Sequence, residues 1–429
     1  MSSATQPAAT DLTETPAPQS GFESDSSDGS VRGALQAYVD RVRGGDLGAL
    51  PAVAGIVVLS ILFSVLRPET FPTALNITNL FVQAVPISLL AMGLVFVLLL
   101  GEIDLSAGVV SGVCAAVMAI EMARHDVPWY WAVLSAIVVG AAIGLFTGLL
   151  VSIVRIPSFV VTLALFLGWQ GVTLRLIGQG GTVPVRDEVI VGLTNSSMSV
   201  MWGWILAVVI VVLYALLQLN RWRVQKSRNL ATQPLAIVVA RIVTIAVITL
   251  AVTMVLNVNR ALNPNFTLAG IPYAIPVVIA LLLLLTFLAS RTSFGRHVYA
   301  VGGNAEASRR AGISVVRIRV LVFVLSSTMA AISGIAAASR LSSVDPSSGG
   351  GNTLLYAVGA AVIGGTSLFG GRGRVRDAVL GGLVIAIIAN GLGLLQVAAY
   401  LNFIITGAVL LLAASVDALA RRRAAATGH

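Results

Sequence analysis

Residues 79–100 read NLFVQAVPISLLAMGLVFVLLL, a run of 22 residues without one charged side chain. An α-helix rises about 1.5 Å per residue, so this run is long enough to cross the roughly 30 Å hydrocarbon core of a bilayer. The whole chain has the same character, because 57% of its 429 residues are hydrophobic and only 10% are charged. Soluble domains carry about 25% charged residues. The sequence therefore predicts an all-α polytopic membrane protein.

Comparable apolar runs recur along the chain, and about 10–12 transmembrane helices are expected. The number is a range because the second and third runs nearly touch and the tenth is rich in glycine. The candidate spans lie near residues 50–67, 79–100, 104–122, 129–153, 157–177, 202–219, 235–257, 272–290, 319–338, 353–370, 377–397 and 400–419. Two small-xxx-small ridges, Gly140/Gly144/Gly148 and Gly108/Gly112, predict close packing between helices.

The segments that flank these spans differ in composition. Residues 1–30 are rich in Ser, Thr, Ala and Pro and hold five acidic residues, so they are predicted to form a disordered cytoplasmic tail. This start lacks the basic segment and apolar core of a signal peptide. Residues 31–49 are a pre-membrane segment, residues 50–420 the transmembrane domain, and residues 421–429 a basic cytoplasmic tail.

The basic residues predict the orientation, since cytoplasmic loops of membrane proteins carry an excess of Arg and Lys. With the N-terminus inside, the inside segments hold Arg155, Arg221, Arg223, Lys226, Arg228, Arg291, Arg296, Arg309, Arg310, Arg317, Arg319, Arg372, Arg374, Arg376, Arg421, Arg422 and Arg423. The outside loops hold only Arg124, Arg175, Arg186, Arg260 and Arg340. Both termini are therefore predicted to be cytoplasmic. The same asymmetry explains the net charge of +9 without a nucleic-acid partner.

One predicted cytoplasmic loop contains a short polar segment, GGNAEASRRAGIS at residues 302–314. Its helix-end preferences are met by the N-cap Asn304, Glu306 in the first turn, Arg309 and Arg310 in the last turn, and Gly312 at the left-handed C′ position. The pattern predicts about two turns of helix. Because so short a helix is marginal alone in water, it is expected to lean on its own membrane domain or on another protein.

The sequence lacks the elements of a nucleotide-hydrolysing site. A P-loop needs G-x-x-x-x-G-K-[ST], but Lys226 and Ser227 have no glycine at that spacing. Cys114 is the only cysteine and the three histidines are scattered, so no disulfide, metal site or cofactor is predicted. The chain is therefore not expected to be an enzyme, and any ATP hydrolysis must take place on another subunit.

Two acidic residues, Glu102 and Asp104, interrupt the apolar sequence in GEIDLSAG, residues 101–108. A charge at the bilayer centre costs roughly 2.5–3.5 kcal/mol, so each acid needs a partner or a polar cavity. Asp104 and Ser106 suit a cap for the next span in a cytoplasmic loop. Two other roles stay open: an ion or proton site at a broken helix for the two acids, and a place on the substrate path or its gate for Glu102, Asp104 and Ser106.

A further candidate lies in residues 339–375, where a polar, glycine-rich loop precedes an apolar run that is itself interrupted by glycines. Irregular backbone at membrane depth is tolerated only where protein or a water-filled cavity surrounds it. Gly364, Gly365 and Thr366 are therefore candidates for a gate or a pathway lining. Close helix packing followed by a turn is the alternative.

Five motifs occur in a fixed order, namely GEIDLSAG (101–108), IPSFVVTLALF (156–166), GGNAEASRRAGI (302–313), SRLSS (339–343) and AVIGGTSLFGGRGRV (361–375). Together they resemble the permease subunits of bacterial ABC importers for monosaccharides, the ribose and xylose type, from about residue 50 to 420. The segment 267–304 and the additional apolar sequence around 202–257 look more like the xylose type. The usual GGIDLS reads GEIDLS here, and the acidic N-terminal tail lies outside the family pattern.

This resemblance implies a multi-pass permease of the bacterial cytoplasmic membrane that works as a homodimer. Its implied partners are an ABC ATPase subunit, an extracytoplasmic sugar-binding protein and membrane lipid. The ATPase would dock on a coupling helix, where Glu306, Ala307 and Gly312 match the family's EA…G pattern. Asn304 would cap that helix, and Arg309 and Arg310 would add charge contacts.

The substrate that the resemblance implies is a monosaccharide, with D-xylose first. Few charges lie in the predicted spans, which suits a neutral substrate. The alternative from another class is a proton-coupled secondary transporter that uses Glu102 and Asp104. That alternative explains the two acids but leaves the polar helix at residues 302–314 without a role.

Overall fold

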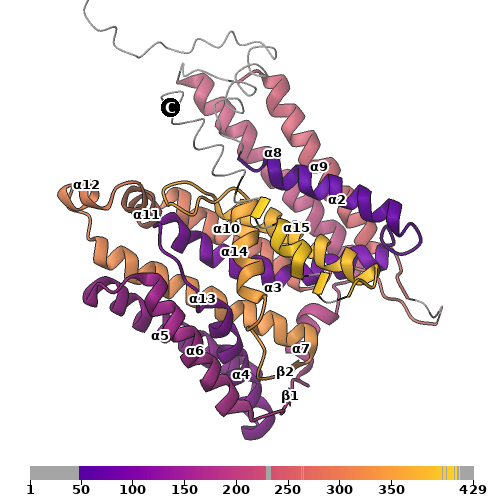
Figure 1. The fold of residues 1–429 in the computed structure, drawn as a ribbon. Coiled ribbons are helices and arrows are strands. Elements are labelled where there is room, and N and C mark those ends of the chain that lie inside the picture. Colours follow the sequence, from indigo (N-terminus) through magenta and orange to yellow (C-terminus); the bar gives the residue numbers. More distant parts are fainter. Residues whose placement is uncertain are drawn as a thin grey trace, which may run out of the picture.

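The computed structural model describes residues 48–228, 233–261, 263, 265–398, 400, 401, 403–409, 411, 412 and 415. These residues are mostly helical (Figure 1). The helices are α2 (Leu50–Leu66), α3 (Ala74–Leu99), α4 (Ala107–His125), α5 (Trp129–Leu149) with the π-helix η1 (Leu150–Val154), α6 (Ser158–Ile177), α7 (Glu188–Asn195), α8 (Val200–Ser227), α9 (Leu235–Asn257), α10 (Ala274–Arg291), α11 (Ser293–Gly303), α12 (Ala305–Arg310), α13 (Val315–Leu341), α14 (Thr353–Ile363) and α15 (Val375–Leu394).

Nine helices within the described residues are long and apolar enough to cross a membrane, namely α3, α4, α5 with η1, α6, α8, α9, α10, α13 and α15. The prediction of an all-α polytopic membrane protein is thereby confirmed. The apolar helices α2 and α14 are shorter, with 17 and 11 residues. The predicted tails 1–30 and 421–429, most of the segment 31–49 and parts of the candidate span 400–419 lie outside the described residues.

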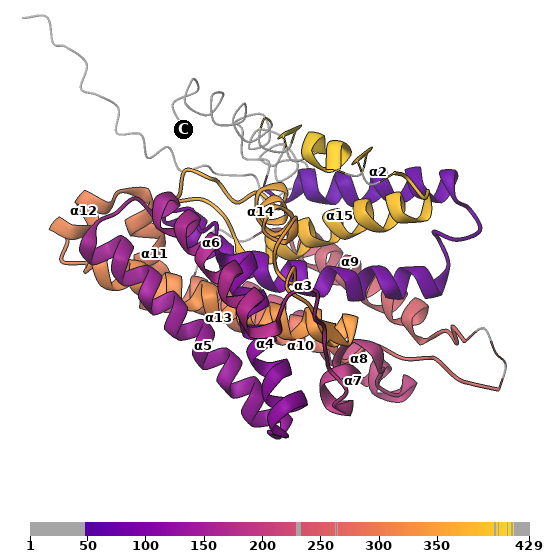
Figure 2. The same ribbon diagram turned by 60° about the horizontal axis from the view of Figure 1, so that its bottom comes forward.

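α3 is the central helix of the fold. α13 packs against α3 and α5, while α15 packs against α3 and α2. Figure 2 shows the resulting order, from α2 at the top through α15, α3 and α13 to α5. Glycines allow the close approach, because a Cβ on Gly144 of α5 would lie 2.5 Å from the Phe323 carbonyl oxygen of α13. Gly140 and Gly148 also face α13, so the predicted packing of this ridge is confirmed.

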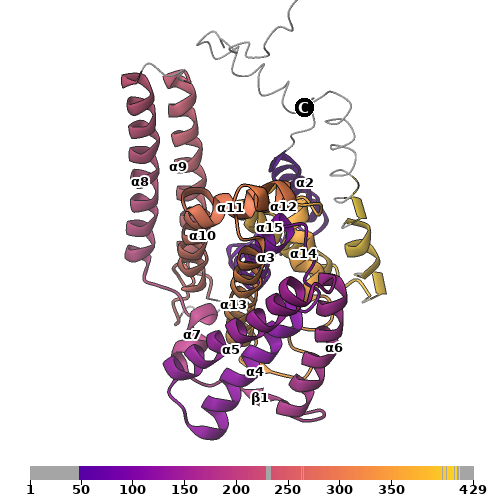
Figure 3. The ribbon, with the colours of Figure 1, turned by 90° about the vertical axis from the view of Figure 1, so that its left-hand side faces the viewer.

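α8 and α9 form a long hairpin at one side of the molecule (Figure 3). They pack mainly against each other, and α9 also touches α3. Only 6% of the most apolar window of α9 is buried, against 83% for α3. The hairpin therefore presents most of its apolar surface outward, where lipid is the expected solvent.

One predicted span, 353–370, is wrong as a continuous helix. α14 ends at Ile363, and residues 364–374 form turns in which Gly365, Gly370 and Gly371 have positive φ angles of 103°, 85° and 72°. Before α14, β2 (Ser343–Val344) pairs with β1 (Val183–Pro184), antiparallel, with Val183 opposite Val344. Residues 345–352 then form successive turns. Residues 345–363 thus form an irregular segment followed by an 11-residue helix.

Candidate functional site

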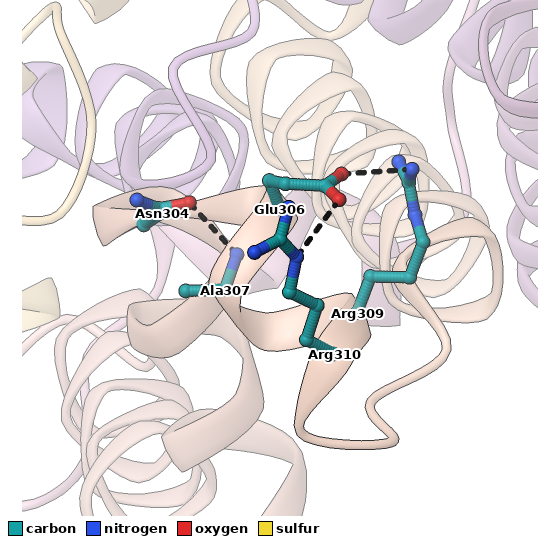
Figure 4. A network of polar contacts seen from close by, with 5 residues as sticks. All are labelled: Asn304, Glu306, Ala307, Arg309 and Arg310. Carbon is teal, nitrogen blue, oxygen red and sulfur yellow. Dashed lines mark hydrogen bonds and ion pairs between the residues drawn. The ribbon is translucent and has the colours of Figure 1, made fainter.

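The segment at residues 302–314 forms the predicted short helix, α12, with a cap at each end. Asn304 Oδ1 accepts a hydrogen bond of 2.9 Å from the Ala307 N–H (Figure 4). At the other end the N–H groups of Gly312 and Ile313 donate to the carbonyls of Arg309 and Ser308, both at 3.0 Å. With Gly312 at φ +83°, this is a Schellman C-cap. The helix is confirmed, whereas its docking role stays a prediction.

The charged side chains of α12 lie on its outer surface. Glu306 contacts Arg309 at 2.9 Å and Arg310 at 3.4 Å. The three side chains are 56%, 66% and 80% exposed. Exposed pairs of this kind contribute only about 0.3–0.5 kcal/mol, so they do little to hold the helix. Ser308 of α12 is buried, and α12 packs against α11 and α13, so packing supports this helix more than the ion pairs do.

The end of α11, just before α12, packs against the end of α3 and the turns after α14. Three glycines make these contacts: Gly302, Gly370 and Gly371. A Cβ on Gly302 would lie 1.8 Å from the Leu99 carbonyl oxygen at the end of α3. A Cβ on Gly370 would lie 2.9 Å from the Gly101 nitrogen and 3.0 Å from the Gly302 oxygen. The Gly371 N–H donates to Leu99 at 2.8 Å. Three separate segments therefore meet backbone to backbone beside α12.

The candidate gate residues lie in the turns that contact α11. Gly364 and Gly365 end α14, and Thr366 is buried with its N–H bonded to the Ala361 carbonyl at 3.0 Å. The Tyr299 hydroxyl of α11 donates to the Gly373 carbonyl at 2.8 Å. This hydrogen bond links α11 to the turns that follow α14.

Glu102 has a basic partner that the sequence pattern did not reveal. Its Oε1 lies 3.0 Å from Arg319 Nε of α13, and the side chains are 14% and 32% exposed. The contact has the distance of an ion pair, while Arg319 Nε lacks hydrogen-bond geometry to any described residue. A local partner satisfies the charge of Glu102, so this residue is suited to a structural role.

Asp104 performs the capping that had been predicted jointly for Asp104 and Ser106. Asp104 Oδ1 accepts from the Ser106 N–H at 2.9 Å and from its hydroxyl at 2.7 Å. Ser106 occupies the N-cap position of α4 but makes no side-chain cap itself. Asp104 is buried, and burial raises its pKa against the opposing effect of the Ser106 hydrogen bonds.

The structure thus joins Glu102 to α13 through Arg319 and places Thr366 beside Gly373, which Tyr299 of α11 contacts. Gly364 lies against Asp377 of α15 and Gly365 against Gly48, while Asp104 and Ser106 lie at the start of α4. The local motifs did not identify Tyr299, Arg319 and Gly302, because their partners are distant in sequence. Among the described residues no group of three or more His, Cys, Asp or Glu side chains could hold a metal ion.

Comparison with known proteins assigns the family. A family model described as the permease component of the branched-chain amino acid transport system matches residues 76–414. The chain is 34% identical over 362 residues to the xylose transport system permease protein of Haemophilus influenzae, covering 84% of this chain and 94% of that protein. No solved structure matches it significantly.

Two relatives from Escherichia coli K12 extend the comparison. The xylose transport system permease protein is 34% identical over 373 residues, covering 86% of this chain and 92% of that protein. The ribose import permease protein is 30% identical over 366 residues, covering 85% and 92%. The chain therefore belongs to the branched-chain amino acid transport system permease family, as a multi-pass protein of the bacterial cytoplasmic membrane that resembles sugar permeases.

Proposed function

We propose that this chain is the membrane subunit of an ATP-driven importer that carries D-xylose into the cell. Two copies form the permease, both termini are cytoplasmic, an ABC ATPase binds the cytoplasmic face and an extracytoplasmic sugar-binding protein binds the outer face. The higher identity to xylose permeases, 34% against 30% for ribose and 29% for D-allose permeases of E. coli K12, supports xylose as the first choice.

The observation that carries the proposal is the construction of α12. Its backbone is capped at both ends, one side is anchored to α11 and α13, and its three charged side chains remain exposed. A helix held in this way transmits force from a partner to the membrane domain. The contacts of α11 with the end of α3 and with the turns after α14 give that force a route.

Uptake of labelled D-xylose, with and without the gene, tests the transport reaction. A protonophore is added while cellular ATP is held constant. Gene-dependent uptake that survives the protonophore is expected, because ATP rather than the proton gradient supplies the energy. Uptake that collapses with the gradient contradicts the ATP-driven reaction, and gene-dependent uptake of ribose or allose alone contradicts the choice of xylose.

The docking role of α12 is tested with the double variant Glu306→Gln and Arg309→Gln, which keeps both caps. It should lower uptake at least tenfold at unchanged membrane expression, because the two exposed charges contact the ATPase in this proposal and contribute little to folding. The matched control is Glu306→Asp with Arg309→Lys, which keeps both charges on the exposed surface of α12 and should therefore keep uptake. Normal uptake in the α12 variant would refute the coupling role.

One observation favours the proton-coupled alternative, namely the raised pKa of the buried Asp104. A carboxyl group that carries protons needs a raised pKa. Against this role, one Asp104 oxygen is committed to capping α4, and Glu102 is paired with Arg319. Proton coupling requires Asp104→Asn to abolish uptake while the ATPase still binds, whereas the importer proposed above keeps its uptake in this variant.

A further inference from the structure

The chain between β2 and α14 forms no helix and lies beside two helices of membrane length, α4 and α6. Residues 345–352 are fixed by short-range hydrogen bonds, such as those from the Ser347 N–H and hydroxyl to Asp345 Oδ1 at 2.8 and 2.6 Å. They pack on the first two turns of α4, where a Cβ on Gly112 would lie 1.9 Å from the Ser348 carbonyl oxygen. The Gly108/Gly112 ridge therefore receives this loop as well as the start of α14, where a helix partner had been predicted.

The depth of residues 345–352 in the membrane can be estimated from their position along α6, which lies beside α4 and runs parallel to it. The Ile103 N–H before α4 donates to Ser158 at the start of α6, and Arg124 at the end of α4 donates to the Leu176 carbonyl near the end of α6. Gln170 of α6 approaches the loop, with Nε2 3.9 Å from the position of a Cβ on Gly350. At about 1.5 Å per residue, Gln170 lies about 18 Å from Ser158 and about 10 Å from the last residue of α6.

Polar groups at this depth are exposed on the surface of the chain. In the loop, Ser347 and Gly351 are exposed and the other residues are partly exposed; Gln170 of α6 is exposed as well. Among the described residues, nothing accepts a hydrogen bond from the Gly351 and Asn352 N–H groups or from the Gln170 amide. Lipid cannot satisfy such groups, and irregular backbone at membrane depth persists only inside protein or beside water.

We propose that residues 345–352 and Gln170 line the aqueous path through the permease and bind the hydroxyl groups of the transported neutral sugar. Backbone N–H groups, hydroxyls and an amide are the uncharged donors and acceptors that suit a polyol. The sugar part of this assignment rests on the proposed function, whereas the water-filled path does not. The competing occupant of this surface is a second copy of the chain.

Cysteine accessibility tests the path. The buried native thiol is removed as Cys114→Ala, and Ser347→Cys and Gln170→Cys are introduced singly into the full transporter in native membranes. Val247→Cys is the matched control, since Val247 lies in the middle of α9 and is 60% exposed. A thiol reacts as the thiolate, which forms in water and not in hydrocarbon. Both path variants should therefore react with a membrane-impermeant methanethiosulfonate at least tenfold faster than the control.

The sugar contact is tested on the same variants. A saturating concentration of D-xylose, with its binding protein and ATP, should slow labelling of Gln170→Cys at least threefold. In uptake assays, Gln170→Leu should lower uptake more than Gln170→Asn. Labelling no faster than that of Val247→Cys overturns the path, and so does efficient oxidative cross-linking of Ser347→Cys between two copies of the chain. Fast labelling that no monosaccharide slows overturns the sugar contact. If no monosaccharide is taken up either, the proposed function fails separately from the path.

Discussion

Asp104 has one carboxyl oxygen in a hydrogen-bonded cap and the other buried without a described partner. Oδ1 accepts both hydrogen bonds from Ser106, while Oδ2 has no hydrogen-bond donor among the described residues. The ionised form therefore stabilises the first turn of α4 but leaves a buried charge only half satisfied. Asparagine at this position would keep the Oδ1 acceptor and remove the charge.

We therefore expect Asp104→Asn to match or exceed the wild-type stability at pH 7. Asp104→Ala, which loses the cap, should cost about 1 kcal/mol. Because the folded pKa is raised above the ordinary value of 3.8, the folded state holds more protons than the unfolded state in the window above that value. Stability should accordingly fall as the pH rises through the folded pKa, and this dependence should be absent in Asp104→Asn.

The measurement is the thermal midpoint of the purified protein in detergent, from pH 5 to pH 7.5. The difference between the wild type and Asp104→Asn isolates this carboxyl group from other titrating groups. If the wild type became more stable relative to Asp104→Asn as the pH rises, the predicted direction of the pH dependence would be wrong. An Asn variant no more stable than Asp104→Ala would contradict the cap.

Helix ends set by local residues were predictable from the sequence, whereas helix breaks set by distant contacts were not. Asn304 and Gly312 act on backbone groups within four residues, so the short helix α12 was predicted with both caps. The break after α14 lies at Gly364 and Gly365, where added Cβ atoms would meet the carbonyl oxygens of Asp377 and Gly48, both distant in sequence. The glycines of this run predicted an interruption of the apolar sequence but not the residue at which the helix ends, so span 353–370 extended past Ile363.

The junction of α11 with α3 gives a matched pair of variants. Gly302→Ala places a Cβ 1.8 Å from the Leu99 carbonyl oxygen, whereas a Cβ on Gly303 meets no atom within 4 Å. Backbone must move in the first variant, so we expect a loss of about 1–3 kcal/mol in unfolding free energy. Uptake should fall with it, because this junction links α12 to the membrane domain.

Gly303→Ala should be neutral or slightly stabilising, since alanine is the better helix former by about 1 kcal/mol. Denaturant unfolding in detergent gives the free energies, and sugar uptake at equal expression gives the functional effect. Equal stability and uptake for the two variants would show that the tight contact between α11 and α3 is not required.

At the scale of the molecule, composition predicted the class of fold but not the order of packing. α3 and α9 are both strongly apolar, yet most of the α3 window is buried and almost none of the α9 window is. Hydropathy cannot separate a helix that faces lipid from one that faces protein, because both surroundings are apolar. Glycine spacing carried part of the missing information, as the Gly140/Gly144/Gly148 ridge against α13 shows.

The number of membrane crossings before Ala398 predicts whether residues 400–419 cross the membrane. Up to Ala398 the described residues contain nine helices of membrane length. If the shorter apolar helix α2 and the irregular segment that ends in α14 also cross, the number of crossings is eleven. An odd number leaves Ala398 on the opposite side from the N-terminus. If both termini are cytoplasmic, as the arginine distribution predicts, residues 400–419 must form the twelfth crossing.

Reporter fusions test this directly. Alkaline phosphatase fused after Ala398 should be active and green fluorescent protein at the same site dark, because the former needs the outer side and the latter the cytoplasm. Fusions after His429 should give the reverse, and fusions after Asp126 and Ala311 serve as outer and cytoplasmic controls. The same side reported after Ala398 and His429 would mean that residues 400–419 do not cross. One terminus would then lie outside, and the arginine asymmetry would need another cause.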